Sequence, residues 1–235
     1  VSFNTLPEGR TLNDDYHSPD ELIDIVSEYP LQFCPGEHWA YTNTGYVLLG
    51  LIVERLASAP FSHVIADRIL TPLGLASTAM RHAGDDDHRV VTGHQRRAPI
   101  TSAVDYATPF AAGSIASTAG DTVRFWHALL TARLLPTADV RAAFATMFPM
   151  QPMFPAPPDT RMYYGRGVQY TVTPGGAAGP GPMLVLDGGM PGFNATVAYL
   201  TLDNVYIAVL TNDKEVPAAA GLWGLVRTLR SYRAG

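Results

Sequence analysis

Apolar residues recur at helical spacing through the first two thirds of the chain. The segment from Gly45 to about Ser58 shows this most clearly. Those apolar positions are Val47, Leu48, Leu51, Ile52 and Leu56. The pattern predicts an amphipathic helix that buries one face.

Local start and stop signals predict more helices in the same region. They are expected from Ser18 to about Glu28, between Pro60 and Pro72, from Thr118 through Leu130, and from Thr137 to Met147. Ser18 is an N-cap residue followed three residues later by Glu21, which is a capping-box pattern, and Thr118 with Asp121 resembles it. Proline cannot continue an established helix, so the second of these helices should end before Pro72.

A proline-rich stretch over 149–158 separates this helical region from a segment with a different period. Short strands are predicted after it at Tyr163–Thr173, Met183–Leu186, Phe193–Leu202 and Val205–Leu210, and a final helix at about Val216–Tyr232. The Gly/Pro run 174–182 reads as a surface hairpin loop. Helices followed by an antiparallel sheet and a closing helix indicate an α+β fold. We expect a helical region over residues 1–158 and a sheet region over 159–235, packed as one unit.

Composition and charge exclude several classes of function. The chain has 235 residues, 47% of them hydrophobic, which is enough for a substantial core. A net charge of −5 provides no basic surface for nucleic acid, and no apolar run is long enough to span a membrane. A single cysteine, Cys34, excludes an internal disulfide and is interpreted as a packing residue. The compartment stays open between cytoplasmic and extracytoplasmic.

Two polar clusters have the wrong spacing for the chemistry that they suggest. Asp85-Asp86-Asp87-His88, with His82 and His94, matches no zinc or calcium pattern, so we interpret it as a solvated acidic loop and expect no metal. Ser114 lacks the Gly-x-Ser-x-Gly context of a nucleophile elbow, so we interpret its segment as a tight loop.

One stretch carries the most informative pattern. A Tyr-x-Asn sequence, Tyr41-Thr42-Asn43, follows a Pro/Gly turn and runs directly into the predicted helix. Three further segments follow along the chain: Thr71-Pro72-Leu73-Gly74-Leu75 with Thr78, Ala112–Thr118 with Asp121, and Gly188-Gly189-Met190-Pro191-Gly192-Phe193. Together they resemble the serine β-lactamase and penicillin-binding-protein superfamily from about Leu31 to the C-terminus. The resemblance implies a β-lactamase-like α+β fold.

The resemblance also assigns roles to the residues of these motifs. Tyr41 would be the general base or proton relay, and Asn43 would hold the substrate amide and the family's catalytic Ser/Lys pair in place. The alternative is that both residues only cap and pack a turn. A tyrosine with a pKa of about 10 is a weak base near neutral pH, so Tyr41 needs a nearby cation. The family uses no metal or other cofactor for this step.

Asp187-Gly188-Gly189-Met190 falls where the family carries Lys-Thr-Gly or His-x-Gly on the strand that lines the substrate cleft. The two glycines would let the substrate backbone approach, and the Met190 N–H would be an oxyanion donor. An aspartate in place of a cation repels a substrate carboxylate, by about 1 to 4 kcal/mol near 4 Å. This favours neutral or cationic esters and amides. The alternative is that Asp187 is a strand-end turn residue in a motif that has lost its function.

The chain lacks the Ser-x-x-Lys element that provides the nucleophile in this family. Lys214 is its only lysine, and Thr211 stands three residues before it at the end of a predicted strand. We therefore expect the N-terminal strands and the nucleophile helix to be absent. The function implied is part of a serine acyl hydrolase, an esterase, amidase or D-Ala-D-Ala-type peptidase, inactive as this chain alone. A non-catalytic binding or scaffold module and an acyltransferase of the same fold remain alternatives.

In the family the last strand of the sheet pairs with the first strand of the chain. Without that partner, Val205–Leu210 would be an open apolar edge, which is a template for pairing with another chain. We therefore expect a companion polypeptide, or a dimer formed through this edge, besides a small ester, amide or peptide substrate.

Overall fold

The computed structural model describes residues 1–3, 5–6, 15–85, 89–100, 104–151, 158–173 and 181–234. The chain forms two compact units. Unit 1 comprises Val1–Val90 and Thr101–Ser117, and unit 2 comprises Val91–Ile100 and Thr118–Gly235. Both units therefore contain segments that are distant in the sequence.

Unit 1 is mainly helical. Its elements are α1 (Pro19–Ser27), α2 (Asn43–Ala57), α3 (Phe61–Ile65), the π-helix η1 (Ala66–Leu70), α4 (Thr71–Leu73), β1 (Ala79–Met80), the 3₁₀-helix η2 (Phe110–Ala112) and β4 (Ile115–Ala116). The strands β1 and β4 pair antiparallel, with Ala79 opposite Ala116. The helix predicted from Gly45 to about Ser58 is confirmed as α2, which begins two residues earlier, at Asn43.

The capping box predicted for α1 is present. The Ser18 hydroxyl accepts a hydrogen bond from the Glu21 N–H at 3.3 Å, and the Glu21 carboxylate accepts one from the Ser18 N–H at 2.7 Å. Pro19 occupies the first helical position, where its missing N–H needs no partner. These two bonds fix the start of α1 from local sequence alone.

The prediction that the third helix ends before Pro72 is wrong. The helical path continues from Phe61 through η1 into α4, and it ends only at Gly74, which has a left-handed backbone with φ 63°. The π-turn moves the hydrogen bonds to i→i+5, so that Thr71 N–H donates to the Ala66 carbonyl. This change of hydrogen-bond register lets Pro72 lie at the start of a new helical turn, where proline is tolerated.

The core of unit 1 ties the start of the chain to α2. Buried Phe3, Leu6, Leu22 and Val47 form one cluster. The Phe3 N–H also donates to the Thr44 hydroxyl at 3.1 Å, and the Thr42 hydroxyl donates to the Val1 carbonyl at 3.2 Å. The first residues of the chain are therefore held against the N-terminus of α2.

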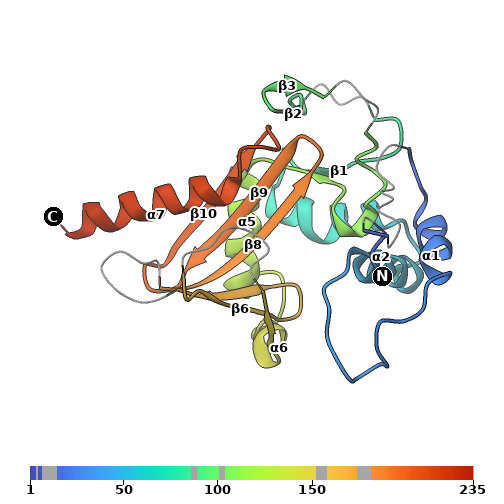
Figure 1. Cartoon of the computed structure of the whole chain (residues 1–235), viewed down its shortest axis with the longest axis horizontal. Coiled ribbons are helices and arrows are strands. Elements are labelled where there is room, and N and C mark those ends of the chain that lie inside the picture. Colours follow the sequence, from blue (N-terminus) through green and yellow to red (C-terminus); the bar gives the residue numbers. More distant parts are fainter. Residues whose placement is uncertain are drawn as a thin grey trace. The chain divides into compact units, whose positions relative to one another are not determined.

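Unit 2 contains a six-stranded antiparallel sheet with helices against it (Figure 1). Its elements are β2 (His94–Gln95), β3 (Ala98–Pro99), α5 (Ala119–Leu130), α6 (Thr137–Ala145), β5 (Phe148–Met150), β6 (Arg161–Tyr164), β7 (Gln169–Val172), β8 (Pro182–Met190), β9 (Phe193–Leu200), β10 (Val205–Thr211) and α7 (Ala218–Ala234). The strand order is β10-β9-β8-β7-β6-β5, and β2 pairs with β3 separately. The α+β prediction is confirmed.

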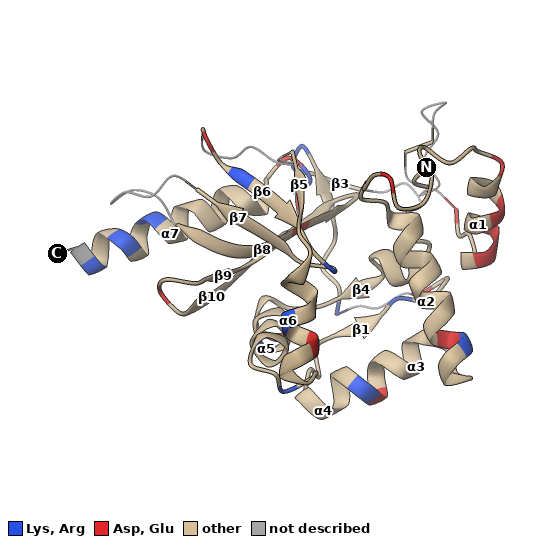
Figure 2. Ribbon diagram, turned by 90° about the horizontal axis from the view of Figure 1, so that it is seen from below, with Lys and Arg blue, Asp and Glu red and all other residues tan. Residues whose placement is uncertain are grey.

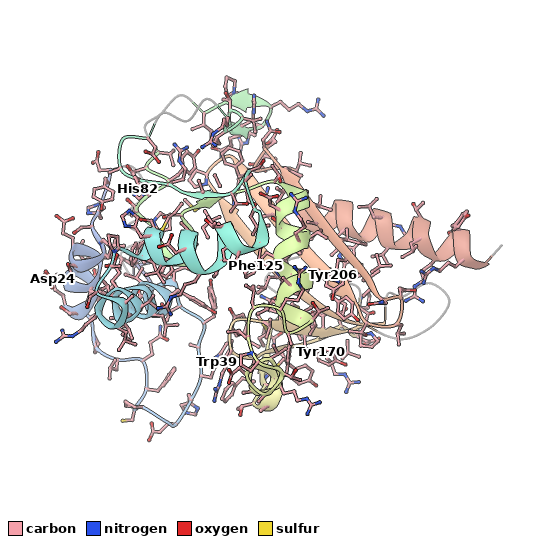
Figure 3. The ribbon with its side chains drawn as sticks, turned by 180° about the vertical axis from the view of Figure 1, so that it is seen from behind. Asp24, Trp39, His82, Phe125, Tyr170 and Tyr206 are labelled. Atoms are coloured by element: carbon pink, nitrogen blue, oxygen red, sulfur yellow. The ribbon has the colours of Figure 1, made fainter. Side chains whose placement is uncertain are left out.

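Side chains alternate between the two faces of the sheet. On one face Met183, Val185, Ala198 and Leu200 pack with Leu222 and Val226 of α7. On the other face Leu184 and Val197 pack with Trp126 of α5, in a cluster that also contains Phe125 and Tyr206, which are labelled in Figure 3. Because successive strand residues face opposite sides, odd positions of β8 face α7 and even positions face α5.

Two strand predictions differ from the structure. Tyr163–Thr173 was expected to be one strand, but β6 and β7 are separated by a turn in which Gly167 has φ 77°. Glycine adopts such a backbone without strain, so the chain reverses there. The second difference is the length of β8, which runs past Leu186 through Gly188 and Gly189 to Met190. Pairing with β9 holds the two glycines in the strand.

The described sheet ends at β10, which pairs only with β9. Leu210 on this edge strand is 39% exposed. No single helix within the described residues is long and apolar enough for a membrane span; α2 with the helical segment Phe61–Leu73 meets the length and hydropathy criteria only as a pair bent by 80°.

Arginines lie along α7, and acidic residues lie on α1 (Figure 2). Arg230 and Arg233 contact the Asp203 carboxylate at 2.8 and 2.6 Å, and the Asp203 side chain is almost fully buried. These arginines therefore fasten α7 to the turn between β9 and β10, and the single Asp203 carboxylate offsets part of their positive charge.

Candidate functional site

Tyr41 and Asn43 are brought together at the start of α2. Thr42 is the N-cap of the helix, and its hydroxyl accepts a hydrogen bond from the Thr44 N–H at 3.2 Å. This cap places Asn43 in the first turn, where the Tyr41 hydroxyl donates to its Oδ1 at 2.8 Å. The Asn43 N–H donates to the Ser2 hydroxyl at 3.2 Å. The Tyr-x-Asn pair is thus a preformed unit on a helix N-terminus.

The surroundings of Tyr41 disfavour its phenolate. Partial burial raises the pKa of Tyr41, and the nearby phenol of Tyr46 raises it further. The two rings are tilted, with centroids 5.8 Å apart. As a whole residue Tyr41 remains 39% exposed. Tyr41 is therefore a hydrogen-bond donor in this chain. Because its pKa is raised, it is also a weak base.

The segment Asp187–Met190 forms the projecting end of β8. Among the described strands, β9 pairs with β8 from Met183 to Met190, whereas β7 pairs with it only from Pro182 to Val185. The last residues of β8 therefore have a strand neighbour on one side only. Gly188 and Gly189 are exposed, and a Cβ added to Gly188 would meet nothing within 4 Å. Among the described strands, the backbone after Val185 is therefore unpaired along one edge.

Asp187 makes a specific contact within the sheet. Its Oδ1 accepts a hydrogen bond from the Thr196 hydroxyl at 2.5 Å, and Thr196 is directly opposite it on β9. Both residues belong to the face that packs with α7, by the alternation along the strands. Burial raises the pKa of Asp187, and the bond from Thr196 lowers it by a smaller amount. The Asp187 charge is thus partly shielded, which weakens the repulsion expected from its sequence position.

The predicted site residues are divided between the two units. Tyr41 and Asn43 belong to unit 1, and Asp187, Gly188, Gly189 and Met190 belong to unit 2. The structure brings together the members of each group. Their roles in catalysis or binding stay predictions.

The polar residues that we interpreted as structural have structural surroundings. Ser114 is buried, and its hydroxyl donates to the Ala107 carbonyl at 2.8 Å. Ile115 and Ala116, which were expected in a loop, form strand β4, because they pair with β1.

Cys34 is exposed, so its interpretation as a packing residue is wrong. Residues 86–88 of the acidic cluster and 174–180 of the expected hairpin loop lie outside the described residues, among which no group of metal-ligating side chains occurs.

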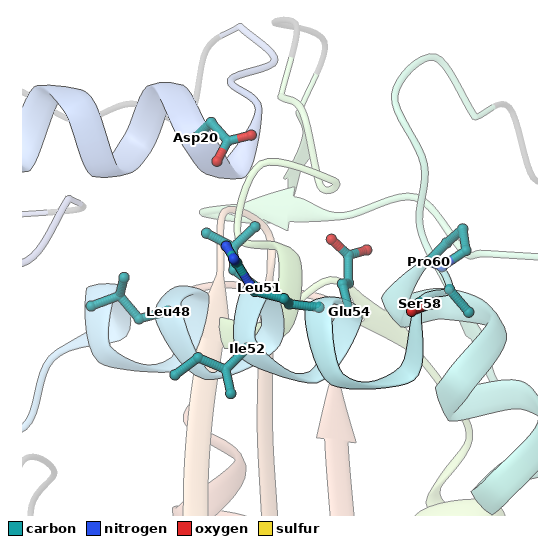
Figure 4. Close-up of a pocket in the computed structure, with 9 residues that line it drawn as sticks. Asp20, Leu48, Leu51, Ile52, Glu54, Ser58 and Pro60 are labelled. Carbon is teal, nitrogen blue, oxygen red and sulfur yellow. The ribbon is translucent and has the colours of Figure 1, made fainter.

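An open depression borders α2 (Figure 4), and neither Tyr41 nor Asn43 lines it. Its lining residues are Asp20, Leu48, Leu51, Ile52, Glu54, Arg55, Ser58, Ala59 and Pro60. Leu48, Leu49, Ile52 and Leu56 are 44%, 56%, 52% and 82% exposed. The face of α2 that the sequence pattern predicted to be buried is thus partly exposed in this chain.

Sequence reasoning missed one residue next to the glycines. A Cβ added to Gly189 would lie 2.6 Å from the Nζ of Lys214. Lys214 was considered only as part of a nucleophile motif and excluded from that role. Its position depends on the pairing of β8, β9 and β10, which no local pattern reports.

Comparisons with known structures agree with the fold. The D-amino acid amidase from Ochrobactrum anthropi SV3 superposes with a TM-score of 0.79 at 23% identity, over 98% of this chain and 68% of that one. A penicillin-binding protein from Bacillus halodurans gives a TM-score of 0.70 at 21% identity, over 91% of this chain and 64% of that one.

Sequence relatives and a family model point the same way. An uncharacterised protein of Mycobacterium tuberculosis is 31% identical over 138 residues, which are 55% of this chain and 32% of that protein. A putative D-alanyl-D-alanine carboxypeptidase of Escherichia coli K12 is 33% identical over 58 residues, 25% of this chain and 13% of that protein. The chain thus spans less than a third of the length of these two relatives in the matched regions. The model of the family described as Beta-lactamase matches residues 2–229, so the chain belongs to the Beta-lactamase family.

Proposed function

We propose that this chain is the part of a serine acyl hydrolase that carries the proton relay and the substrate-binding strand. The observation that carries the proposal is the Tyr41–Asn43 pair, bonded at 2.8 Å on a helix N-terminus, in a chain of the Beta-lactamase family. The open edge of Asp187–Met190 supports it, since a strand end of this kind accepts an extended acyl substrate. The substrates are small esters, amides or peptides.

In the proposed reaction a serine hydroxyl from outside this chain attacks the substrate carbonyl. Tyr41, with its pKa lowered by the lysine of the same Ser-x-x-Lys element, takes the serine proton and passes it to the leaving alcohol or amine. The Met190 N–H donates to the oxygen that becomes negatively charged, and Asn43 holds the substrate amide. Water then attacks the acyl-serine, and Tyr41 accepts a proton from the water and returns it to the serine oxygen as the bond to the acyl group breaks.

The nucleophile has to come from a segment outside these 235 residues, because they contain one lysine and no Ser-x-x-Lys. We propose that this segment, in the same polypeptide or a companion one, pairs with the open edge of β10. Two surfaces favour such an addition. They are the edge strand Val205–Thr211, which pairs only with β9 among the described strands, and the exposed leucines and isoleucine of α2.

A non-catalytic binding module is the second candidate, favoured by the raised pKa of Tyr41 and by the acidic residue at Asp187. Such a module would bind the same substrates at β8 without cleaving them. Hydrolysis by a protein that contains the nucleophile segment separates the two candidates. An acyltransferase differs only in using an alcohol or amine in place of water for the second step.

The test is a hydrolysis assay with D-phenylalanine amide and a p-nitrophenyl ester. We expect no turnover by this chain alone and turnover once the Ser-x-x-Lys segment encoded with it is present, either joined to the chain or added as a separate polypeptide. The same preparation with that serine changed to alanine is the control. Binding without hydrolysis by the reconstituted protein would favour the non-catalytic module, and turnover by the chain alone would refute the proposal.

A further inference from the structure

Lys214 is held in a fixed loop at the end of the sheet. The loop follows β10, and the Asn194 amide of β9 donates to the carbonyls of Asp213, Lys214 and Val216 at 3.0, 3.1 and 3.1 Å. The Lys214 N–H donates to the His94 carbonyl at 2.9 Å. These bonds to two separate segments determine where the lysine side chain starts.

The side chain reaches across β9 to the end of β8. Asn194 is opposite Gly189 in the register, and a Cβ on Gly189 would lie 3.3 Å from Asn194 Oδ1 and 2.6 Å from Lys214 Nζ. The ammonium therefore occupies the space that a side chain at position 189 would fill. A glycine at this position leaves room for the cation against the backbone of β8, on the face to which position 189 points.

The charge of Lys214 is available to a ligand. The residue is exposed, and within the described residues no carboxylate lies within the 4.0 Å ion-pair distance of its Nζ. The nearest acidic position along β8, Asp187, uses its Oδ1 to accept the Thr196 hydroxyl. An ammonium without an ion-pair partner among the described residues, next to Gly189, is a site for an anionic group.

We propose that Lys214 binds the carboxylate of an acyl substrate or product lying along β8, and so determines specificity for anionic over neutral compounds. The ligand class is N-acyl amino acids and peptides with a free carboxylate. The inference rests on the proposed function only in taking Gly188 and Gly189 as the substrate-binding edge. It reverses the preference that Asp187 alone predicts, because Lys214 places a positive charge next to Gly189.

The single lysine makes a direct test possible by NMR. The chain is labelled with ¹³C,¹⁵N-lysine and ¹⁵N-glycine and titrated with N-acetyl-D-alanyl-D-alanine and, separately, with its C-terminal amide. We expect the carboxylate compound to shift the Lys214 side-chain signals and the Gly188 and Gly189 amides, and to bind about tenfold more tightly than the amide. Added salt should reduce this preference, since the site is exposed.

Substitutions distinguish a specific role of Lys214 from an effect of the net charge of the chain. Lys214→Met should remove the tenfold preference and leave the affinity for the amide unchanged, whereas Lys214→Arg should retain a preference. Arg227→Met makes the same change in net charge at an exposed position of α7 and should keep the full preference. Equal binding of both compounds, with shifts at Gly188 and Gly189, would overturn the role of Lys214 and leave the proposed function standing. The absence of shifts at both glycines with either compound would overturn both proposals.

Discussion

Tyr41→Phe is expected to lower the acylation rate of the reconstituted enzyme by about 10² to 10⁴, the usual contribution of a positioned proton-transfer group. The substitution keeps the ring and its tilted contact with Tyr46, and it removes only the hydroxyl that donates to Asn43. Folding should therefore change little. The measurement is the single-turnover acylation rate of a p-nitrophenyl ester, which separates chemistry from product release.

Tyr46→Phe is the matched control for this experiment. It removes a hydroxyl from the neighbouring ring, in the first turns of α2, and should change the rate by less than about threefold, because Tyr46 has no assigned role in proton transfer. A rate for Tyr41→Phe equal to that of Tyr46→Phe would show that the pair at the start of α2 is only a capped turn.

Gly50→Ala is expected to destabilise unit 1 by about 1 to 3 kcal/mol, the usual effect of overpacking. A Cβ at Gly50 would lie 2.5 Å from Ala111 Cβ and 2.5 Å from a ring carbon of Phe110, where α2 packs on η2. Neither contact is the free end of a flexible side chain, so α2 and η2 have to move apart. Urea unfolding at constant m-value measures the change.

The same helix offers an internal control. At Gly45 an added Cβ would meet only Thr42 Cγ2, at 3.5 Å, which is ordinary contact. Gly45→Ala should therefore be neutral or gain up to about 1 kcal/mol from helix propensity. Equal effects of the two substitutions would mean that the contact between α2 and η2 does not limit stability.

Local signals predicted the parts of the fold that depend on neighbouring residues. The capping box at Ser18 and the cap at Thr118 gave the starts of α1 and α5, because a few side-chain bonds decide each helix end. The Tyr41–Asn43 pair was identified from its resemblance to a Tyr-x-Asn motif, and it lies at the start of α2. The break at Gly165–Gly167 and the helix through Pro72 were missed, since backbone conformation there depends on turn chemistry and on a π-turn.

The position of Lys214 could not be predicted from the sequence. A lysine at position 214 meets a glycine at position 189 only because three strands pair in one register and Asn194 holds the intervening loop. Alternation within a strand determines which side a residue faces but not which distant residue lies beside it. Reasoning from Asp187 alone therefore took account of its negative charge and missed the positive charge of Lys214.

Intact-mass measurement after treatment with a fluorophosphonate or a penicillin tests the central claim most directly. We expect no adduct on this chain alone, and one adduct per molecule on the serine of the Ser-x-x-Lys segment once that segment is supplied. A stoichiometric adduct on the chain alone would contradict the claim that its proton relay lacks a nucleophile.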